Sequence, residues 1–140
     1  DLDFIIVDMP PGTGDTQLTF SQEIKMDGAI IVSTPQEVAL LDVKRGIKMF
    51  DKLGVKILGL IDNMSFFIGD DGKKYKIFGE GGVKRTAEEF EKEFLGEIPI
   101  DPIVGKAADE GKPIVEGDPE NKTSKIYINL ANKVKSQFIK

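Results

Sequence analysis

Short apolar runs alternate with amphipathic stretches along the chain, and this alternation predicts strands and helices in turn. The apolar runs are rich in β-branched residues and predict buried strands at 4–7, 28–33 and 56–61. The amphipathic stretches carry apolar residues at helical spacing and predict helices at 15–23, 37–52 and 83–94. Three such steps predict an α/β fold, with a mainly parallel sheet and helices on both of its faces.

Turn residues divide the rest of the chain. Asp70-Asp71-Gly72 stands between two apolar runs and predicts the turn of a hairpin over 66–78, although the two carboxylates could in principle be ligands of a hard cation. Asp101-Pro102 and Asp118-Pro119 each predict the start of a helix, and Asp15 is a candidate N-cap. Gly111 is expected to end the helix that begins at Asp101-Pro102.

Composition narrows the class of protein. With 140 residues, of which 40% are hydrophobic and 31% charged, the chain is expected to form a single domain, 1–140. The net charge of −5 argues against nucleic acid as a partner, and no apolar run is long enough to span a bilayer. The chain contains no cysteine, which excludes disulfides and is typical of a cytoplasmic protein.

The most informative segment begins at the first apolar run. Phe4-Ile5-Ile6-Val7 is followed by Asp8 and then by Met9-Pro10-Pro11-Gly12-Thr13-Gly14-Asp15. An acid at the tip of a buried parallel strand can hold Mg²⁺ through water, and glycines let backbone N–H groups approach a phosphate. The alternative is an ordinary strand-to-helix turn that contains an aspartate.

Further motifs follow in a fixed order, and together they resemble one family. They are Thr34-Pro35-Gln36-Glu37-Val38-Ala39-Leu40-Leu41-Asp42, Asp62-Asn63-Met64-Ser65, Ile77-Phe78-Gly79-Glu80-Gly81-Gly82, Phe94-Leu95-Gly96-Glu97-Ile98-Pro99-Ile100-Asp101 and Gly111-Lys112-Pro113-Ile114-Val115. With the Asp8 segment, they resemble the second half of the Mrp (ApbC-type) P-loop ATPases, iron–sulfur cluster carriers related to MinD, ParA and the nitrogenase iron protein. The resemblance covers about residues 1–117.

The resemblance implies a nucleotide site for ATP and Mg²⁺. Asp8 matches the acid on the metal side, and Gly12 and Gly14 match the loop whose backbone senses the γ-phosphate. Asn63 matches an adenine-contacting residue, with a strand-end turn as its alternative role. The base pocket would be closed by Ile98, Pro99 and Asp101, the last of which is equally explained as a helix cap.

Two departures from the family qualify this expectation. The family's phosphate-binding loop, KGGVGK[ST], has no counterpart, because the glycine-rich segment 79–86 has Lys84 where the pattern needs glycine and is better interpreted as a helix entry. The sequence therefore looks like the C-terminal half of such an ATPase. The C-x-x-C that the family often carries before Phe78 is missing too, so this chain has no thiolate to hold an iron–sulfur cluster.

The last segment, 118–140, predicts an amphipathic helix. Its apolar residues recur every four positions, and lysines accompany them. In MinD-type relatives such a helix docks to membranes, but packing on the sheet with the lysines outward is the favoured interpretation.

Three functions follow from these observations. The leading one is an ATP-binding iron–sulfur cluster carrier that hydrolyses ATP only when the phosphate-loop half completes it. Such a protein would be a cytoplasmic homodimer whose partners are apo iron–sulfur proteins or cluster scaffold proteins. The alternatives are a MinD/ParA-like positioning ATPase at a membrane surface and a non-catalytic interaction module that retains the fold.

Overall fold

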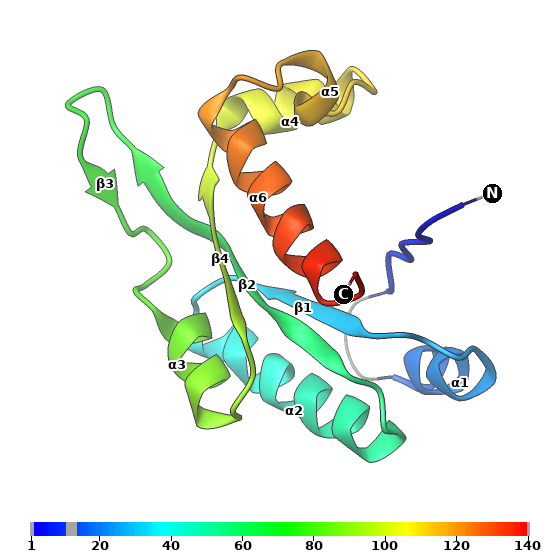
Figure 1. Ribbon diagram of the computed structural model, residues 1–140. Coiled ribbons are helices and arrows are strands. Elements are labelled where there is room, and N and C mark those ends of the chain that lie inside the picture. Colours follow the sequence, from blue (N-terminus) through cyan, green and yellow to red (C-terminus); the bar gives the residue numbers. More distant parts are fainter. Residues whose placement is uncertain (1, 11–13, 140) are drawn as a thin grey trace.

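A computed structural model describes residues 2–10 and 14–139 (Figure 1). The helices are α1 (Asp15–Glu23), α2 (Glu37–Leu53), α3 (Gly82–Glu89), α4 (Pro102–Asp109), α5 (Ile114–Gly117) and α6 (Lys122–Ser136). The strands are β1 (Ala29–Ser33), β2 (Ile57–Ile68), β3 (Lys74–Tyr75) and β4 (Phe94–Ile100). Gly12 lies outside the described residues, so its expected role in a phosphate loop is not addressed by the structure.

The long strand β2 is the centre of the sheet. β1 and β4 both run parallel to it, and β3 returns antiparallel along its far end. The hairpin of β2 and β3 confirms the predicted hairpin over 66–78, and it projects away from the helices (Figure 1). The first strand of the hairpin is a continuation of the strand predicted at 56–61, so the two form one element.

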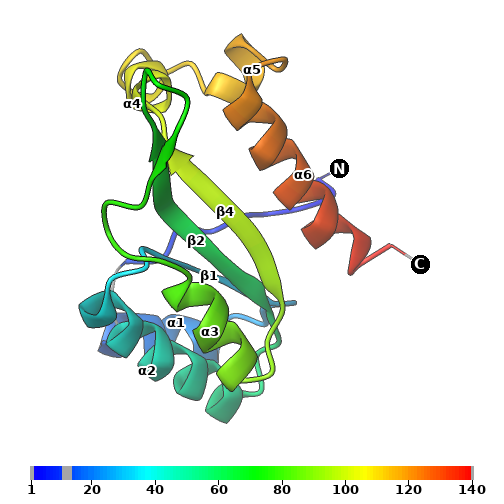
Figure 2. The same cartoon turned by 90° about the vertical axis from the view of Figure 1, so that its left-hand side faces the viewer.

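Helices cover both faces of the sheet, as predicted (Figure 2). On one face, α2 and α3 enclose a core of Leu40, Val43, Ile47, Ile57, Leu60, Val83 and Ala87. On the other face, α6 packs against Ile61, Leu95 and Ile98 through Leu130, with Ile126, Tyr127 and Val134 around it. The predicted α/β architecture is therefore confirmed, and the last helix packs on the sheet and not away from it.

Two bulges attach α6 to the sheet. Leu58 is the extra residue where the β1–β2 register shifts between Ala29 and Ile30, and Leu95 is the extra residue of β4 opposite Leu60 and Ile61. Their carbonyl oxygens accept hydrogen bonds from α6 and the residue after it: Gln137 Nε2 donates to Leu58 at 2.8 Å, and Lys133 Nζ donates to Leu95 at 2.6 Å. Side chains of the helix thus satisfy carbonyls at positions where the ladder is interrupted.

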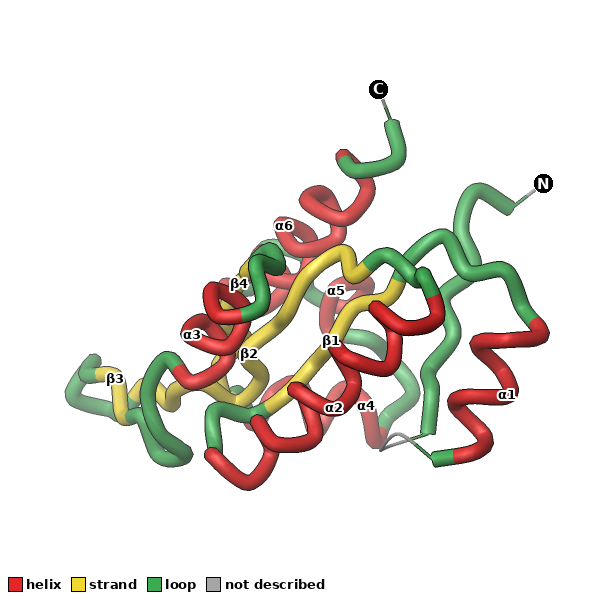
Figure 3. The backbone as a smooth tube through the Cα atoms, turned by 90° about the horizontal axis from the view of Figure 1, so that it is seen from below, coloured by secondary structure: helices red, strands yellow, loops and turns green. Residues whose placement is uncertain are grey.

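The predicted strand at 4–7 is wrong for the structure described here. Residues 4–10 form no strand, and Figure 3 shows them as loop. Ile5 is 75% exposed and Ile6 is 81% exposed, so the apolar run is not covered. A buried strand needs backbone partners on both sides, and in the described part of the chain this run pairs with none. Phe4 makes an edge-to-face contact with Phe138, with ring centroids 5.9 Å apart.

Three boundaries also differ from the predictions. The helix predicted at 83–94 ends at Glu89, because Phe94 begins β4, a strand that the Gly and Pro of its own sequence obscured. α6 begins at Lys122 with Asn121 as N-cap, whereas Asp118 accepts a hydrogen bond from the Asn121 N–H at 3.2 Å. Asp15 is the first residue of α1 and Gly14 is its N-cap, so Asp15 does not cap that helix.

Candidate functional site

The carboxyl ends of β1 and β4, with the part of β2 that lies between them, bring together most of the predicted base site. Ser33 of β1 pairs with Asp62 of β2, and Asn63 pairs with Ile98 of β4. Thr34, which follows β1 directly, therefore lies at the same sheet edge as Asn63 and Pro99. Ligands of open parallel sheets bind beyond this edge, which makes it the candidate site.

Asn63 is half-buried, and one side of its amide is already engaged. Its Oδ1 accepts a hydrogen bond of 3.1 Å from the Met64 N–H. This contact fixes the carboxamide, and in the described structure its Nδ2 group makes no hydrogen bond. The amide can thus donate from Nδ2 and still accept through a second lone pair, as recognition of an adenine edge requires.

The residues predicted to close the base pocket divide into two kinds. Ile98 is 6% exposed and its side chain belongs to the α6 core, while Pro99 is half-buried at the sheet edge. Asp101 caps α4, because its Oδ1 accepts from the Ile103 N–H at 3.0 Å. Its Oδ2 accepts from the Thr123 hydroxyl at 2.6 Å, so both oxygens connect helices to each other. Asp101 therefore has a structural role in this chain, whether or not it also lies near a base.

The predicted phosphate-side residues Asp8 and Gly14 do not lie at the end of a sheet strand in the described structure. Asp8 is exposed and lies in loop, and in the described part of the chain it makes no hydrogen bond or ion pair. Gly14 is exposed, adopts an extended conformation and accepts from the Leu18 N–H at 3.1 Å as the N-cap of α1. Asp8 and Asn63 were both predicted at strand ends, but Asp8 belongs to no described strand and Asn63 lies within β2, which continues to Ile68.

One buried acid next to this site, Asp62, was given no role in the sequence analysis. Asp62 is 1% exposed, its Oδ1 has no hydrogen-bond partner in the described structure, and its register partner on β4 is Glu97. Burial, and then the charge of Glu97, raise the pKa of Asp62 to about 6, which Lys76 partly offsets. The sequence does contain a signal for this residue: the acid directly follows five apolar or glycine residues, 57–61, of a predicted buried strand. A carboxylate is costly to bury, so an acid at such a position is unusual.

The hairpin of β2 and β3 lies in the interval between Ser65 and Phe78, where the sequence has no cysteine. Asp71 closes its turn, accepting from the Lys73 N–H at 3.0 Å and from the Tyr75 hydroxyl at 2.8 Å. These two hydrogen bonds, the backbone one first, lower the pKa of the Asp71 carboxyl. The prediction of a turn is confirmed. Across residues 2–10 and 14–139, no group of three or more His, Cys, Asp or Glu side chains could hold a metal ion.

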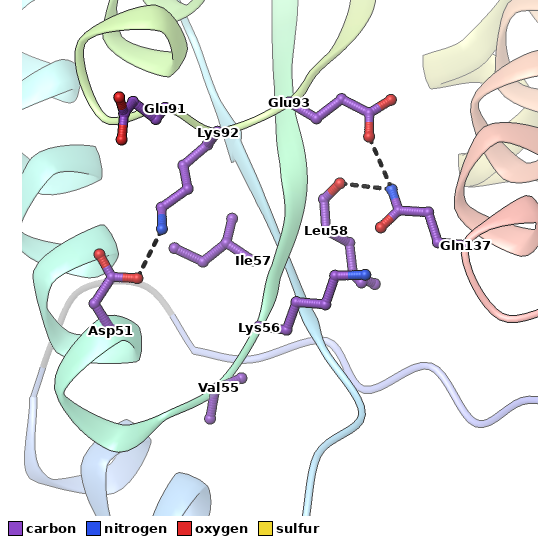
Figure 4. Close-up of a pocket in the computed structure, with 9 residues that line it drawn as sticks. All are labelled: Asp51, Val55, Lys56, Ile57, Leu58, Glu91, Lys92, Glu93 and Gln137. Carbon is purple, nitrogen blue, oxygen red and sulfur yellow. Dashed lines mark hydrogen bonds and ion pairs between the residues drawn. The ribbon is translucent and has the colours of Figure 1, made fainter.

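A further hollow lies at the opposite, amino ends of the strands (Figure 4). It has a volume of about 510 Å³ and is lined by charged groups from several elements. Two polar pairs lie across it, Lys92 with Asp51 at 2.8 Å and Gln137 with Glu93 at 3.1 Å. It lies at the end of the strands opposite to the edge where open parallel sheets bind their ligands, so it is not the candidate site.

Comparison with known proteins decides the family. The profile of the ParA family, described as NUBPL iron-transfer P-loop NTPase, matches residues 1–135. The chain belongs to this family of iron-transfer P-loop NTPases. The family membership confirms the resemblance to Mrp-type ATPases, and it agrees with the sheet and helix arrangement described above.

Curated relatives carry names that refer to iron–sulfur clusters. The "Iron-sulfur cluster carrier protein" of Aquifex aeolicus is 45% identical over 139 residues, which are 99% of this chain and 38% of that protein. The mitochondrial "Iron-sulfur protein required for NADH dehydrogenase" of Arabidopsis thaliana is 50% identical over 96% of this chain and 43% of its own length. The chain thus spans about two-fifths of the length of these relatives.

Solved structures confirm the fold of this chain. A nucleotide-binding protein of Archaeoglobus fulgidus, solved in complex with ADP, superposes with a TM-score of 0.70 at 39% identity, over 82% of this chain and 46% of that one. The cell division ATPase MinD of Pyrococcus furiosus superposes with a TM-score of 0.72 at 25% identity, over 96% and 52%. In the described residues, no helix has the length and apolar character needed to cross a membrane.

Proposed function

We propose that this chain forms the base-binding part of an ATP-dependent iron–sulfur cluster carrier. The single observation that carries the proposal is the position of Asn63, fixed by Met64 N–H, at the carboxyl edge of the parallel sheet of a P-loop NTPase family member. A polypeptide that contains residues 1–140 together with a phosphate-binding loop is called the complete ATPase below. The complete ATPase would bind ATP and Mg²⁺ and would act as a homodimer.

Asp8 is the residue proposed to act on the metal side. Mg²⁺ is commonly bound by one or two carboxylates together with waters and nucleotide phosphates, so a single exposed carboxylate fits this ion. Gly12 and Gly14 would supply backbone N–H groups near the γ-phosphate. The metal would neutralise the charge of the phosphates, while Asp8 would orient its hydration shell.

Exposed apolar surface supports the need for further polypeptide. Ile5 and Ile6 are 75% and 81% exposed, and Val32 of the sheet strand β1 is 55% exposed. β1 pairs with β2 on one side only in the described structure. The phosphate-loop half of a complete ATPase would cover these residues, and residues 4–7 would then have the strand partners that they lack here.

The cluster is proposed as cargo, with its thiolate ligands supplied from outside residues 1–140. This chain has no cysteine, and thiolates are the usual ligands of such clusters. Apo iron–sulfur proteins or scaffold proteins would be the partners. The MinD-like alternative is less supported, because α6, its one argument, uses its apolar face to pack on the sheet.

The experiment compares the 140-residue chain with the complete ATPase after anaerobic reconstitution with iron and sulfide. The 140-residue chain should remain colourless and hydrolyse ATP no faster than a blank, because thiolates and the loop lysine are absent from its sequence. The complete ATPase should bind ATP and pass a cluster to an apo iron–sulfur acceptor. A complete ATPase that neither binds ATP nor transfers a cluster would contradict the proposal.

A further inference from the structure

Met64 has a backbone conformation that is uncommon for its type. Its φ is 54°, in the left-handed region, and of the described non-glycine residues only Glu91, with a φ of 53°, shares this. For an L-residue with a long side chain, this region costs free energy and is adopted only where the surroundings enforce it. The position directly follows Asn63 at the sheet edge.

Two side chains hold Met64 in this conformation. Asn63 Oδ1 accepts from the Met64 N–H at 3.1 Å. On the other side, the buried Ser65 hydroxyl donates to the Ile98 carbonyl of β4 at 3.2 Å. The β2–β4 register shifts between Asn63–Ile98 and Phe67–Ile100, so the chain bulges in the segment that contains Met64.

The bulge presents the Met64 side chain to solvent. That side chain is 41% exposed, whereas Ser65 and Phe66 beside it are buried. Packing does not explain why an apolar side chain is held at this strained position. The position lies next to the Asn63 amide, which is proposed to contact the edge of a base. Met64 adds little to the core, yet its conformation is enforced from both sides.

We propose that Met64 is a binding residue of the base site, and that its thioether covers one face of the bound purine while Asn63 contacts its edge. This inference rests on the proposed nucleotide-binding function. A methionine is suited to the task because its sulfur is polarisable and makes favourable contacts with aromatic rings. Pro99, half-buried on the adjacent strand, adds apolar surface to the same edge.

The test measures the affinity of the complete ATPase for Mg-ATP and for inorganic tripolyphosphate by isothermal titration calorimetry. Met64→Gly removes the side chain, and glycine tolerates the left-handed conformation, so the variant should fold. We expect the dissociation constant for ATP to rise about 3- to 10-fold. The affinity for tripolyphosphate, which has no base, should not change.

Two control variants separate the effect of losing the Met64 side chain from the effect of relieving its backbone conformation. Met64→Leu keeps an apolar side chain of similar volume and should bind ATP within about 2-fold of the parent. Glu91→Gly relieves the same backbone conformation at the other end of the sheet and should change neither affinity.

The outcomes distinguish this inference from the proposed function. If the parent binds ATP but Met64→Gly binds it equally well, or loses ATP and tripolyphosphate equally, the role of Met64 is wrong and the proposed function stands. If the parent does not bind ATP, both are wrong.

Discussion

Lys133 Nζ donates a hydrogen bond of 2.6 Å to the main-chain carbonyl oxygen of Leu95, the extra residue of a bulge in β4. Leu95 is fully buried, so without this donor its carbonyl would lose its partner from α6. Gln137 Nε2 likewise donates a hydrogen bond to the carbonyl oxygen of Leu58 in β2. The basic character of α6 is thus partly explained by its attachment to the sheet.

Lys133→Met should therefore destabilise the fold. Loss of a hydrogen bond from a charged donor to a buried carbonyl costs about 1–3 kcal/mol in free energy of unfolding. Urea unfolding followed by circular dichroism measures this difference. Lys135→Met, on the same helix at an exposed position, should change stability by less than about 0.5 kcal/mol. Equal effects of the two substitutions would mean that the contact with Leu95 contributes nothing.

Asp62→Asn should stabilise the fold at neutral pH. The folded-state pKa of Asp62, about 6, lies above the ordinary value of 3.8, so the folded protein binds this proton more tightly than the unfolded chain does. The stability that this proton contributes is fully present below about pH 4 and is lost as the pH rises to about 6. Asparagine carries no charge, so the variant does not undergo that loss.

The measurement is urea unfolding of parent and variant at pH 7.5 and pH 4. We expect Asp62→Asn to be more stable by about 1–3 kcal/mol at pH 7.5 and nearly equal to the parent at pH 4. Asp70→Asn, in the exposed hairpin turn, serves as the control for the change of residue type and should change the stability by less than about 0.5 kcal/mol. A variant that is less stable than the parent at pH 7.5 would show that the Asp62 carboxylate is favourable as an ion.

Asp8→Asn in the complete ATPase should separate turnover from binding. An amide cannot balance the charge of the metal, so Mg²⁺-dependent hydrolysis should fall by about 10-fold or more. Contacts to the base and to most of the phosphates do not involve this side chain, so the dissociation constant for ATP should change far less. Equal losses of binding and turnover would place Asp8 in the fold and not in the chemistry.

Much of the fold could be predicted from the sequence because apolar period and turn residues coincide. The β1 and α2 segments and the first part of β2, 57–61, have clear apolar patterns, and Asp101-Pro102 and Gly111 bracket α4 as predicted. β4 was not predicted, since glycine, glutamate and proline interrupt its apolar residues. Its partner β2 stabilises it through the parallel ladder, a contact between distant segments that local patterns do not encode.

The site could be predicted only in part, for a different reason. The motif placed Asn63 at a strand end, but β2 continues to Ile68, so Asn63 lies within the strand beside the last residues of β1 and β4. The run 4–7 has a typical strand pattern but no strand partner in the described chain, so pattern alone did not decide its structure. The strained φ of Met64 and the unpaired Oδ1 of Asp62 depend on three-dimensional neighbours, and no periodicity in the sequence indicates either.

The most direct test of a base site at this sheet edge is the affinity of the complete ATPase for ATP in the Asn63→Asp variant. Aspartate is nearly isosteric and can still accept the Met64 N–H, but it loses the Nδ2 donor that an adenine edge would use. Isothermal titration calorimetry should show ATP binding weakened about 10-fold or more and tripolyphosphate binding nearly unchanged. An unchanged affinity for ATP in a folded variant would contradict the placement of the base at Asn63.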